Sequence, residues 1–459
     1  MKENKVKIGL EIHVPINTNS KLFCSCSTEP GTPNTRVCEV CLGFPGAKPQ
    51  LNKEALNKIL RLALSLECKI SEKIVFARKI YFYPDLSKNY QITQYEHSLG
   101  HKGVLAISEK KINLTRVQIE EDPGKLNHKD KFSLVDYNRS GIPLAEIVTD
   151  PDFETAEEVL EFMQKLKTIL NYLGIYNLED SSIRADVNVS LEGGERVEIK
   201  NVSGVKNIQK AIKFEIIRQK YLLKKGEKIV QRTVHFDEDS GKTFLSRDKE
   251  SEEDYGYIFE PDLSIIEIEK KYLDRVKKEL PELPHNKFKR FKTEYGLNDF
   301  EASVIISEKE IADLFEELFS EVDKVYLKNW IIVSLKKVLN YNRKKFMETE
   351  LCKSDIQNLI TKVTLKELTP RAAEFVLREM VNKPESVDKI IKRLNLGKTD
   401  SKEIDKIISK IINKYGEVVR EYKNGKEKAL HFLVGQVVRK TKGNANAKEV
   451  IEILKKKLA

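Results

Sequence analysis

Four of the six cysteines lie close together in the N-terminal part of the chain: Cys24, Cys26, Cys38 and Cys41. The segment between the two pairs contains two prolines and a glycine, so we expect a loop over residues 24–41. Two pairs of thiolates can surround a zinc ion tetrahedrally at about 2.3 Å, and four protein ligands leave no open position. The spacing therefore predicts a structural zinc site, with two disulfides or free thiols as the alternatives.

A second set of chemically active side chains lies on the polar faces of predicted strands. Successive side chains of a strand point to opposite faces, so Glu11 and His13 lie opposite the apolar residues of the predicted strand 7–14. Glu146 shares a face with apolar neighbours and would need a partner if it were buried. Other predicted strands contribute the polar residues Glu120, Glu121, Arg184, Asp186, Asn188, Glu198 and Lys200.

If these polar faces converge, they form a concavity rich in carboxylates, with one histidine and several basic groups. Carboxylate oxygens are preferred ligands of Mg²⁺, and Arg and Lys side chains bind phosphate. The alternative is the solvated face of an antiparallel sheet, which produces the same alternation. The residue types favour the concavity, because solvated strand faces usually carry Thr, Lys and Glu rather than His, Asp and Asn.

The pattern along the chain predicts an α+β protein. Over residues 1–290 we expect a domain of mainly antiparallel β-sheet with helices, and Pro281 and Pro284 mark its end. Beyond it we expect an all-helical domain over residues 291–400 and a small all-helical tail domain over residues 401–459. Helical spacing occurs at residues 51–66, 155–173, 206–223, 297–322, 326–339, 351–363 and 371–380.

The tail carries most of the net charge of +10, because residues 401–459 contain 15 Lys and Arg but 7 Asp and Glu. Residues 428–442 have apolar side chains at helical spacing, Gly443 fits a helix stop, and another helix is expected at 447–458. The polar side presents Lys428, Arg439, Lys440, Lys442 and Lys448. A basic surface of this kind suggests RNA as a partner, and a solvated pair of helices is the alternative.

Several functional classes find no support in the sequence. No run of about 18 apolar residues predicts a membrane span, and the charged N-terminus lacks the features of a secretory signal, so we expect a cytoplasmic protein without a membrane partner. Residues 240–243 read Ser-Gly-Lys-Thr, but the first glycine of a P-loop is missing, so we expect a hairpin turn. We find no dinucleotide-binding motif and no nucleophile elbow.

The chain resembles the GatB family, the B subunits of tRNA-dependent amidotransferases, nearly from end to end. Residues 136–144, Asp-Tyr-Asn-Arg-Ser-Gly-Ile-Pro-Leu, match the family signature, and residues 9–14 match its N-terminal motif. Further matching motifs lie at residues 81–86, 88–91, 119–125, 184–190, 198–201, 254–263, 435–438 and 442–446. The resemblance implies a cradle-like catalytic domain, a helical domain and an RNA-contacting tail.

The resemblance also implies a ligase that uses ATP and Mg²⁺ to phosphorylate the side-chain carboxylate of misacylated Glu-tRNA(Gln) or Asp-tRNA(Asn). Ammonia released from glutamine by the glutaminase, or A, subunit then displaces the phosphate, and a C subunit completes the complex. By resemblance, the catalytic groups are Glu11, His13, Glu120, Glu121 and Asp186, of which Glu11, His13 and Glu121 would hold Mg²⁺. The nucleotide would be bound by Arg184, Asn188, Glu198, Lys200, Tyr83 and Lys88.

Two other functions are alternatives. The archaeal E subunit shares the cradle and acts on Glu-tRNA(Gln) alone, but it carries a large inserted domain for which 459 residues leave no room. In the other alternative, the protein is a non-catalytic, zinc-containing scaffold that binds RNA through its basic tail, and the acidic strand faces are merely solvated. ADP release in the presence of misacylated tRNA would separate catalysis from this scaffold role.

Overall fold

The computed structural model describes residues 5–129, 131–176, 183–245, 255–397, 401–441, 444–445 and 447–458. The chain forms two compact units, Met1–Pro284 and His285–Ala459. The division falls at the proline-containing segment identified from the sequence, whereas residue 290 lies inside helix α5 (Pro284–Tyr295). None of the described helices is long and apolar enough to cross a membrane.

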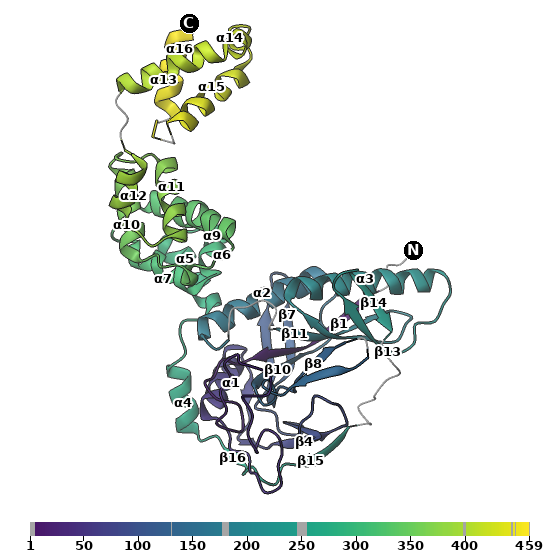
Figure 1. Cartoon of the computed structure of the whole chain (residues 1–459). Coiled ribbons are helices and arrows are strands. Elements are labelled where there is room, and N and C mark those ends of the chain that lie inside the picture. The colour runs from purple at the N-terminus through teal and green to yellow at the C-terminus, as the bar shows by residue number, and fades with distance from the viewer. Residues whose placement is uncertain are drawn as a thin grey trace. The chain divides into compact units, whose positions relative to one another are not determined.

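A nine-stranded sheet forms the centre of the first unit (Figure 1). Its strand order is β14-β13-β12-β11-β1-β10-β7-β6-β2, and all neighbours are antiparallel except β12 and β13. The strands are β1 (Val6–Pro15), β2 (Lys69–Ile70), β6 (Gly100–Ala106), β7 (Lys111–Glu121), β10 (Pro143–Thr149), β11 (Arg184–Leu191), β12 (Val197–Ser203), β13 (Arg232–Asp237) and β14 (Lys242–Leu245). This mainly antiparallel sheet, packed with helices, confirms the predicted α+β class.

Strand β1 shows how the sheet separates an apolar face from a polar one. Ile8, Leu10, Ile12 and Val14 are buried in the main hydrophobic core, as their alternation with polar residues predicted. Three helices supply much of the rest of this core: α1 (Lys53–Ser65), α2 (Ala156–Leu173) and α3 (Val205–Lys224). These positions confirm the three helices predicted in this part of the chain.

The ends of α2 follow from local sequence. Thr155 and Glu158 form a reciprocal capping box, in which each side chain accepts a hydrogen bond from the backbone of the other residue. Gly174 ends the helix in the left-handed conformation, with φ 62°. Both ends are therefore fixed without help from the rest of the fold.

A small antiparallel sheet lies beside β7, with the strand order β15-β4-β5. Its strands are β4 (Ala77–Ile80), β5 (Tyr90–Thr93) and β15 (Gly256–Phe259). Figure 1 shows β4 and β15 on the side of the large sheet away from α2 and α3. The polar face of the large sheet is therefore the face that this small sheet approaches.

The segment at residues 240–243 belongs to a hairpin, as predicted, whose turn spans residues 238–241 and is followed by Lys242 as the first residue of β14. The turn joins β13 to β14, which pair in antiparallel register. The backbone N–H of Ser240 donates to Asp237 Oδ1 at 2.7 Å, and that of Gly241 donates to the Asp237 carbonyl at 2.9 Å. These bonds close a turn rather than a phosphate-binding loop.

The second unit begins with a group of short helices. They are α5, α6 (Asp299–Ile306), α7 (Lys309–Leu318), α8 (Lys324–Asn329), α9 (Lys336–Asn342), α10 (Lys353–Thr364), α11 (Pro370–Asn382) and α12 (Val387–Leu394), with a π-helical segment η3 (Trp330–Leu335) between α8 and α9. The helical spacing over residues 297–322 corresponds to two helices rather than one. Glu308 is extended (φ −131°, ψ 128°), and Lys336 from α9 binds both Ser307 and Glu308 at this break.

The last four helices have a hydrophobic cluster of their own. They are α13 (Ser401–Lys414), α14 (Gly416–Lys423), α15 (Glu427–Lys440) and α16 (Ala447–Leu458). Leu433 and Val437 of α15 are fully buried, and Leu430, Val434 and Val438 are nearly so. The apolar face predicted for this helix is therefore confirmed, whereas Lys442 and the stop at Gly443 lie outside the described residues.

Candidate active site and metal centres

Four adjacent strands bring the predicted carboxylates together around His13. In the register of the sheet, Glu11 lies opposite Asp186 of β11, and His13 lies opposite Glu146 of β10. His13 Nε2 is 3.7 Å from Glu11 Oε1, 3.8 Å from Glu146 Oε2 and 3.8 Å from Glu120 Oε1. We call Glu11, His13, Glu120, Glu146 and Asp186 the carboxylate cluster.

Charge repulsion and burial dominate the chemistry of the cluster. The charge of Glu146 and burial raise the pKa of Glu11 to about 7. Burial and the charge of Glu120 likewise raise the pKa of Glu146. Burial lowers the pKa of His13, but the charges of Glu146, Glu120 and Glu11 outweigh it and raise the pKa above its ordinary value. Ionisable groups whose pKa values are shifted by burial and by one another are typical of functional sites.

Three members of the cluster fit a metal ion. One ligand atom from each of Glu11, His13 and Glu146 can be chosen so that all lie within 4.8 Å of one another. The donors are two carboxylates and an imidazole, and the hard oxygen ligands suit Mg²⁺. The cluster therefore has the donor set for one divalent cation.

Glu121, the third Mg²⁺ ligand predicted from the sequence, does not join this group. Its carboxylate is 2.5 Å from Lys88 Nζ and accepts a hydrogen bond from the backbone N–H of Ile92 at 2.8 Å. Glu146 lies beside His13 instead. The sequence had marked Glu146 only as a buried acid in need of a partner, and the structure supplies His13 at 3.8 Å and Arg116 at 3.4 Å.

Lys79 is a site residue that sequence reasoning missed. Burial lowers its pKa, but the charges of Glu120, Tyr257 and Glu146 raise it above the ordinary value. Its ammonium lies 4.7 Å from the centre of the Tyr255 ring. Lys79 belongs to the short strand β4, whose four residues give no clear alternation, so only the pairing of the small sheet reveals which side chain meets the carboxylates.

The predicted nucleotide-binding residues lie along β11 and β12 and in the segment before β5. Arg184 donates to Asp122 Oδ1 at 2.8 Å, and the same carboxylate lies 3.6 Å from Arg139. Asn188 Oδ1 is buried without a hydrogen-bond partner among the described residues. Glu198 accepts from Thr233 at 3.2 Å. These groups provide positive charge and an unused polar atom beside the carboxylate cluster.

The remaining nucleotide-binding candidates differ in their surroundings. Burial lowers the pKa of Lys200, but the charges of Glu198 and Asp186 outweigh it and raise the pKa above its ordinary value. Lys88 is bound to Glu121. Tyr83 is 48% exposed and therefore available to a ligand. The structure thus brings Lys200 close to the cluster, ties Lys88 to an internal partner and leaves Tyr83 at the surface.

The four cysteines form a compact centre that fits a zinc ion. Their sulfur atoms all lie within 4.8 Å of one another, and Cys38 Sγ is 3.9 Å from Cys41 Sγ. None of the four forms a disulfide in the structure. The hydrogen bond from Cys24 lowers the pKa of Cys41 to about 5, and the Cys38 backbone N–H and Lys21 act in the same direction. Four sulfurs at this spacing suit tetrahedral zinc.

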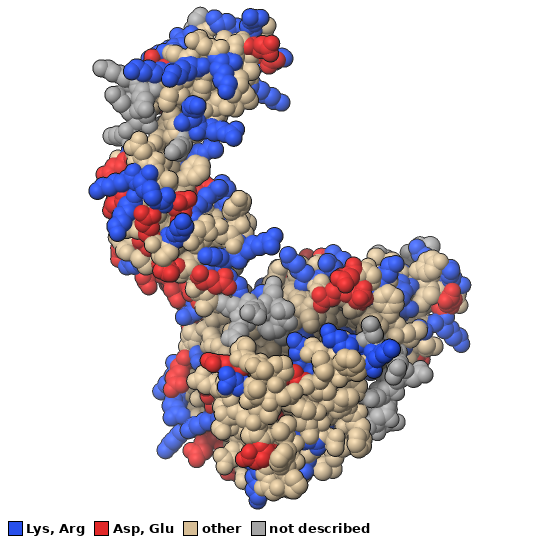
Figure 2. Space-filling view, in the orientation of Figure 1, with Lys and Arg blue, Asp and Glu red and all other residues tan. Residues whose placement is uncertain are grey.

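The tail presents four of its five predicted basic residues to solvent, and Lys442 lies outside the described residues. Lys428, Arg439, Lys440 and Lys448 are exposed, on α15 and α16. Lys and Arg side chains are spread over the visible surface of the tail (Figure 2). The geometry fits a surface that contacts a polyanion.

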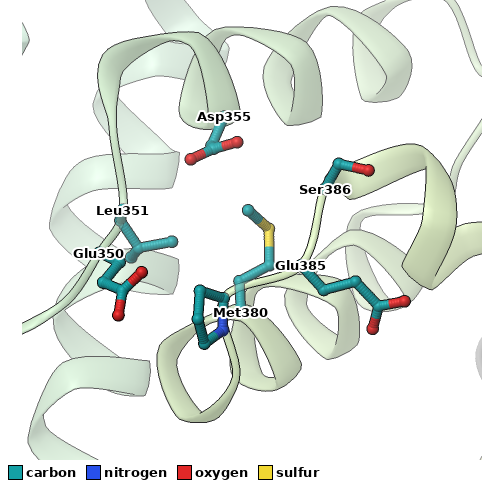
Figure 3. A pocket seen from close by; sticks show the side chains of 7 residues that line it. Glu350, Leu351, Asp355, Met380, Glu385 and Ser386 are labelled. Atoms are coloured by element: carbon teal, nitrogen blue, oxygen red, sulfur yellow. The ribbon is translucent and has the colours of Figure 1, made fainter.

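A small hollow in the second unit has a volume of about 230 Å³ and is drawn in Figure 3. Three carboxylates line it, but two already have internal roles. Asp355 accepts from the backbone N–H of Cys352 at the start of α10, and Glu385 pairs with Arg393 at 3.1 Å. We therefore assign no ligand to this hollow.

Comparison with known proteins assigns a family. A family model described as the GatB/GatE catalytic domain matches residues 6–274, and one described as the GatB domain matches residues 313–458. The chain is 41% identical over 481 aligned positions to the B subunit of the aspartyl/glutamyl-tRNA(Asn/Gln) amidotransferase of Carboxydothermus hydrogenoformans, and the alignment covers 100% of both chains. It is 42% identical to the protein of the same name from Methanothermobacter thermautotrophicus, over 99% of this chain and 100% of the relative.

These alignments decide between the B-type and E-type proteins. They cover the whole length of relatives named as the B subunit, so this chain matches them in length and has no large inserted domain. Every member of the carboxylate cluster and all four cysteines lie within residues 6–274, the range that the catalytic-domain model covers. The chain therefore belongs to the GatB family, the B subunits of the tRNA-dependent amidotransferases.

Proposed function

We propose that this chain is the amidating subunit of a tRNA-dependent amidotransferase. The observation that carries the proposal is the carboxylate cluster around His13, in a chain that is similar to the GatB proteins from end to end. In the proposed reaction, ATP transfers its terminal phosphoryl group to the side-chain carboxylate of Glu-tRNA(Gln), Asp-tRNA(Asn) or both, and ADP is released. Ammonia then displaces phosphate to give the amide.

Glu11, His13 and Glu146 would hold Mg²⁺ in this proposal, because their donor atoms are the ones that can meet at one ion. The ion would neutralise phosphate charge, and phosphoryl transfer depends mainly on positioning and electrostatics. Glu120 is held by Gln91 at 2.7 Å and Thr93 at 2.8 Å, so its carboxylate is held in position beside His13. The catalytic role of Glu121 stays a prediction.

Basic side chains around the cluster would bind the phosphate groups. Arg184 and Lys200 lie on β11 and β12, next to the unpartnered Asn188 Oδ1. Lys79 reaches the same carboxylates from β4 and would offset the negative charge that develops during transfer. These residues come from two different sheets, so the small sheet is part of the proposed site.

We further propose that the cysteine centre binds one structural Zn²⁺ and that this chain works in a complex with the A and C subunits of the amidotransferase. Four protein sulfurs leave no open coordination position, which suits a structural ion. The A subunit would supply the ammonia by hydrolysing glutamine. Metal analysis of the purified protein should return about one zinc per chain.

The proposal is tested with the assembled complex, misacylated tRNA, ATP, Mg²⁺ and either glutamine or ammonium chloride. ADP release that depends on the misacylated tRNA, together with formation of Gln-tRNA(Gln) or Asn-tRNA(Asn), is the expected result. Correctly charged tRNA serves as the matched control and should release no ADP. Tight tRNA binding without ADP release would instead identify the chain as a scaffold.

A further inference from the structure

Lys21 is among the largest fully buried side chains of the protein, with a relative exposure of 0%. It follows directly after Ser20, and its backbone N–H donates to the carbonyl of Cys26 at 3.0 Å, so it lies at the base of the cysteine loop. A lysine ammonium is strongly hydrated in water, and burying it without an anion costs several kcal/mol. A completely buried lysine therefore needs an explanation in terms of its partners.

The partners of Lys21 include no carboxylate. Its Nζ donates to the backbone carbonyl of Tyr137 at 3.2 Å and to Cys41 Sγ at 3.7 Å, and within the described ranges no Asp or Glu forms an ion pair with it. A neutral carbonyl does not balance a full positive charge. The anion that remains is the sulfur of Cys41.

The contact between Lys21 and Cys41 also affects the net charge of the whole cysteine centre. Four thiolates around one Zn²⁺ carry a net charge of −2, and this centre lies largely inside the protein. Cys41 is buried and the other three cysteines are only partly exposed. One ammonium held against one of the sulfurs would reduce the net charge from −2 to −1 where water cannot screen it.

We propose that Lys21 is the built-in counter-charge of the zinc tetrathiolate. It holds its ammonium against Cys41 and so favours the metal-bound form of the four cysteines. The inference rests on the proposed zinc site and adds a residue outside the four ligands. The packing around Lys21 indicates a site that fits this side chain closely. Gly141 has φ +90°, and a Cβ there would lie 3.3 Å from Lys21 Cδ.

A purely structural role makes a different prediction. If Lys21 only braces the Tyr137 carbonyl and fills space, its replacement should change stability equally with and without zinc. A counter-charge acts more strongly in one form than in the other. It stabilises the zinc-loaded protein, where it offsets a net charge of −2, more than the zinc-free protein, where only the Cys41 sulfur lies opposite it.

The experiment compares Lys21→Met with the wild-type chain in three measurements. We expect zinc affinity, measured by competition with a chromophoric chelator, to fall about 10- to 100-fold, the range typical of residues that support metal ligands. We expect Lys21→Met to lower the thermal unfolding midpoint of the zinc-loaded protein. In the chelator-treated protein the same variant should lower the midpoint by a smaller amount.

Two further variants make the result specific. Lys21→Gln keeps a donor for the Tyr137 carbonyl but removes the charge. It should therefore bind zinc as weakly as Lys21→Met. If the methionine variant does not fold, the glutamine variant replaces it in the experiment. Lys58→Met is the matched control, because Lys58 is another lysine of the first unit, is partly buried and pairs with Glu54 at 2.7 Å. It should leave zinc affinity unchanged.

Unchanged zinc affinity in both Lys21 variants would overturn the inference, as would equal destabilisation of the loaded and zinc-free forms. Recovery of zinc affinity by Lys21→Gln would also overturn it, because the hydrogen bond rather than the charge would then be responsible. Failure of the wild-type chain to bind zinc would instead reject the zinc site itself.

Discussion

The repulsion between Glu11 and Glu146 gives the carboxylate cluster an excess of negative charge that a cation can relieve. Both pKa values are raised, Glu11 because of the charge of Glu146 and because of burial, and Glu146 because of burial and the charge of Glu120. His13 and Lys79 offset part of this charge. A divalent cation, as proposed for this site, would offset more of it.

Removal of one carboxylate should therefore disable the site. In Glu146→Gln the side chain keeps its size but loses the charge beside His13 and one proposed Mg²⁺ ligand. We expect ATP-dependent amidation to fall at least about 100-fold, the scale on which a single electrostatic contributor acts. The measurement is amide formation with ammonium chloride as the nitrogen source.

The matched control for this variant is Glu157→Gln on α2, where the carboxylate is exposed and pairs with Lys213 at 2.6 Å. It should leave amidation unchanged. Glutamine hydrolysis by the A subunit should persist in both variants if the complex stays assembled. Wild-type amidation by Glu146→Gln would remove Glu146 from the site.

Mg²⁺ binding should weaken as the pH falls below about 7. The pKa of Glu11 is raised to about 7, so the carboxyl is protonated below that pH, and a proton then competes with the metal. The raised pKa of His13 acts in the same direction, because a protonated imidazole cannot bind a cation. Affinity should thus rise with pH through about 7 and level off above it.

Calorimetric Mg²⁺ titrations at several pH values, in buffers of different ionisation enthalpy, measure this effect and the protons released on binding. The variant Glu11→Gln removes the titrating group and should lose most of the dependence along with much of the affinity. An affinity that is flat between about pH 6 and pH 8 would contradict the raised pKa.

The cysteine loop braces the loop at residues 136–142, which contains most of the family signature at residues 136–144. The side chain of Asn34 donates to the carbonyl of Val135 at 2.9 Å, and its oxygen accepts from the backbone N–H of Tyr137 at 2.8 Å. The backbone N–H of Arg36 donates to Asn138 Oδ1 at 2.7 Å. The braced loop carries Arg139, so the two loops and the Asp122 carboxylate beside Arg139 form one connected unit.

Zinc removal should therefore loosen this unit before it unfolds the sheet. Hydrogen–deuterium exchange of the full chain should show lost protection at residues 20–44 and 136–142 after chelation. The core strand β1 should stay protected, because Ile8 and Ile12 are fully buried in the main hydrophobic core. Unchanged protection at residues 136–142 would show that the contacts across the loops hold without the metal.

At the level of helices and strands, the sequence predicted those elements that polar–apolar alternation or helical spacing indicates. The strand with Glu11 and His13 and the helix after Thr155 are in their predicted places. The division of residues 297–322 into α6 and α7 was not predictable, since the apolar spacing continues through Glu308 while the backbone there is extended. Lys336, which binds Ser307 and Glu308 at the break, comes from α9 and is not visible in the local spacing.

The sequence predicted a cluster of carboxylates with a histidine, but it did not predict every residue of that cluster. Alternation placed Glu11, His13 and Asp186 on polar faces, and the sheet register then brought them together. The choice between Glu121 and Glu146 required the partner of each acid, and Glu121 pairs with Lys88. Lys79 could not be foreseen, because its strand reaches the cluster only through the pairing of β4 with β5 and β15.

At the scale of the whole molecule, the chain divides its roles between two units. Met1–Pro284 contains the carboxylate cluster and the cysteine centre, and His285–Ala459 contains the basic tail. The tail has its own hydrophobic cluster, formed by α13, α15 and α16, so its fold does not depend on the catalytic unit. Loss of the tail should thus affect tRNA binding without dismantling the site.

Deletion of residues 401–459 should weaken tRNA binding and flatten its dependence on salt. Each phosphate contact made by a lysine or arginine releases counterions, so the slope of log affinity against log salt reports the number of such contacts. The exposed Lys428, Arg439 and Lys440 are the described residues of α15 expected to make them. These contacts carry little sequence information, so the loss should be similar for tRNA(Gln) and tRNA(Asn).

The triple variant Lys428→Gln, Arg439→Gln and Lys440→Gln is the finer form of this test, because it removes charge and leaves the apolar face of α15 intact. It should lower the salt slope by roughly three if each side chain meets one phosphate. Zinc content and association with the glutaminase should match the wild-type complex in both forms. Binding of full strength and unchanged salt dependence in the truncated protein would show that the anchor for tRNA lies in the remaining residues.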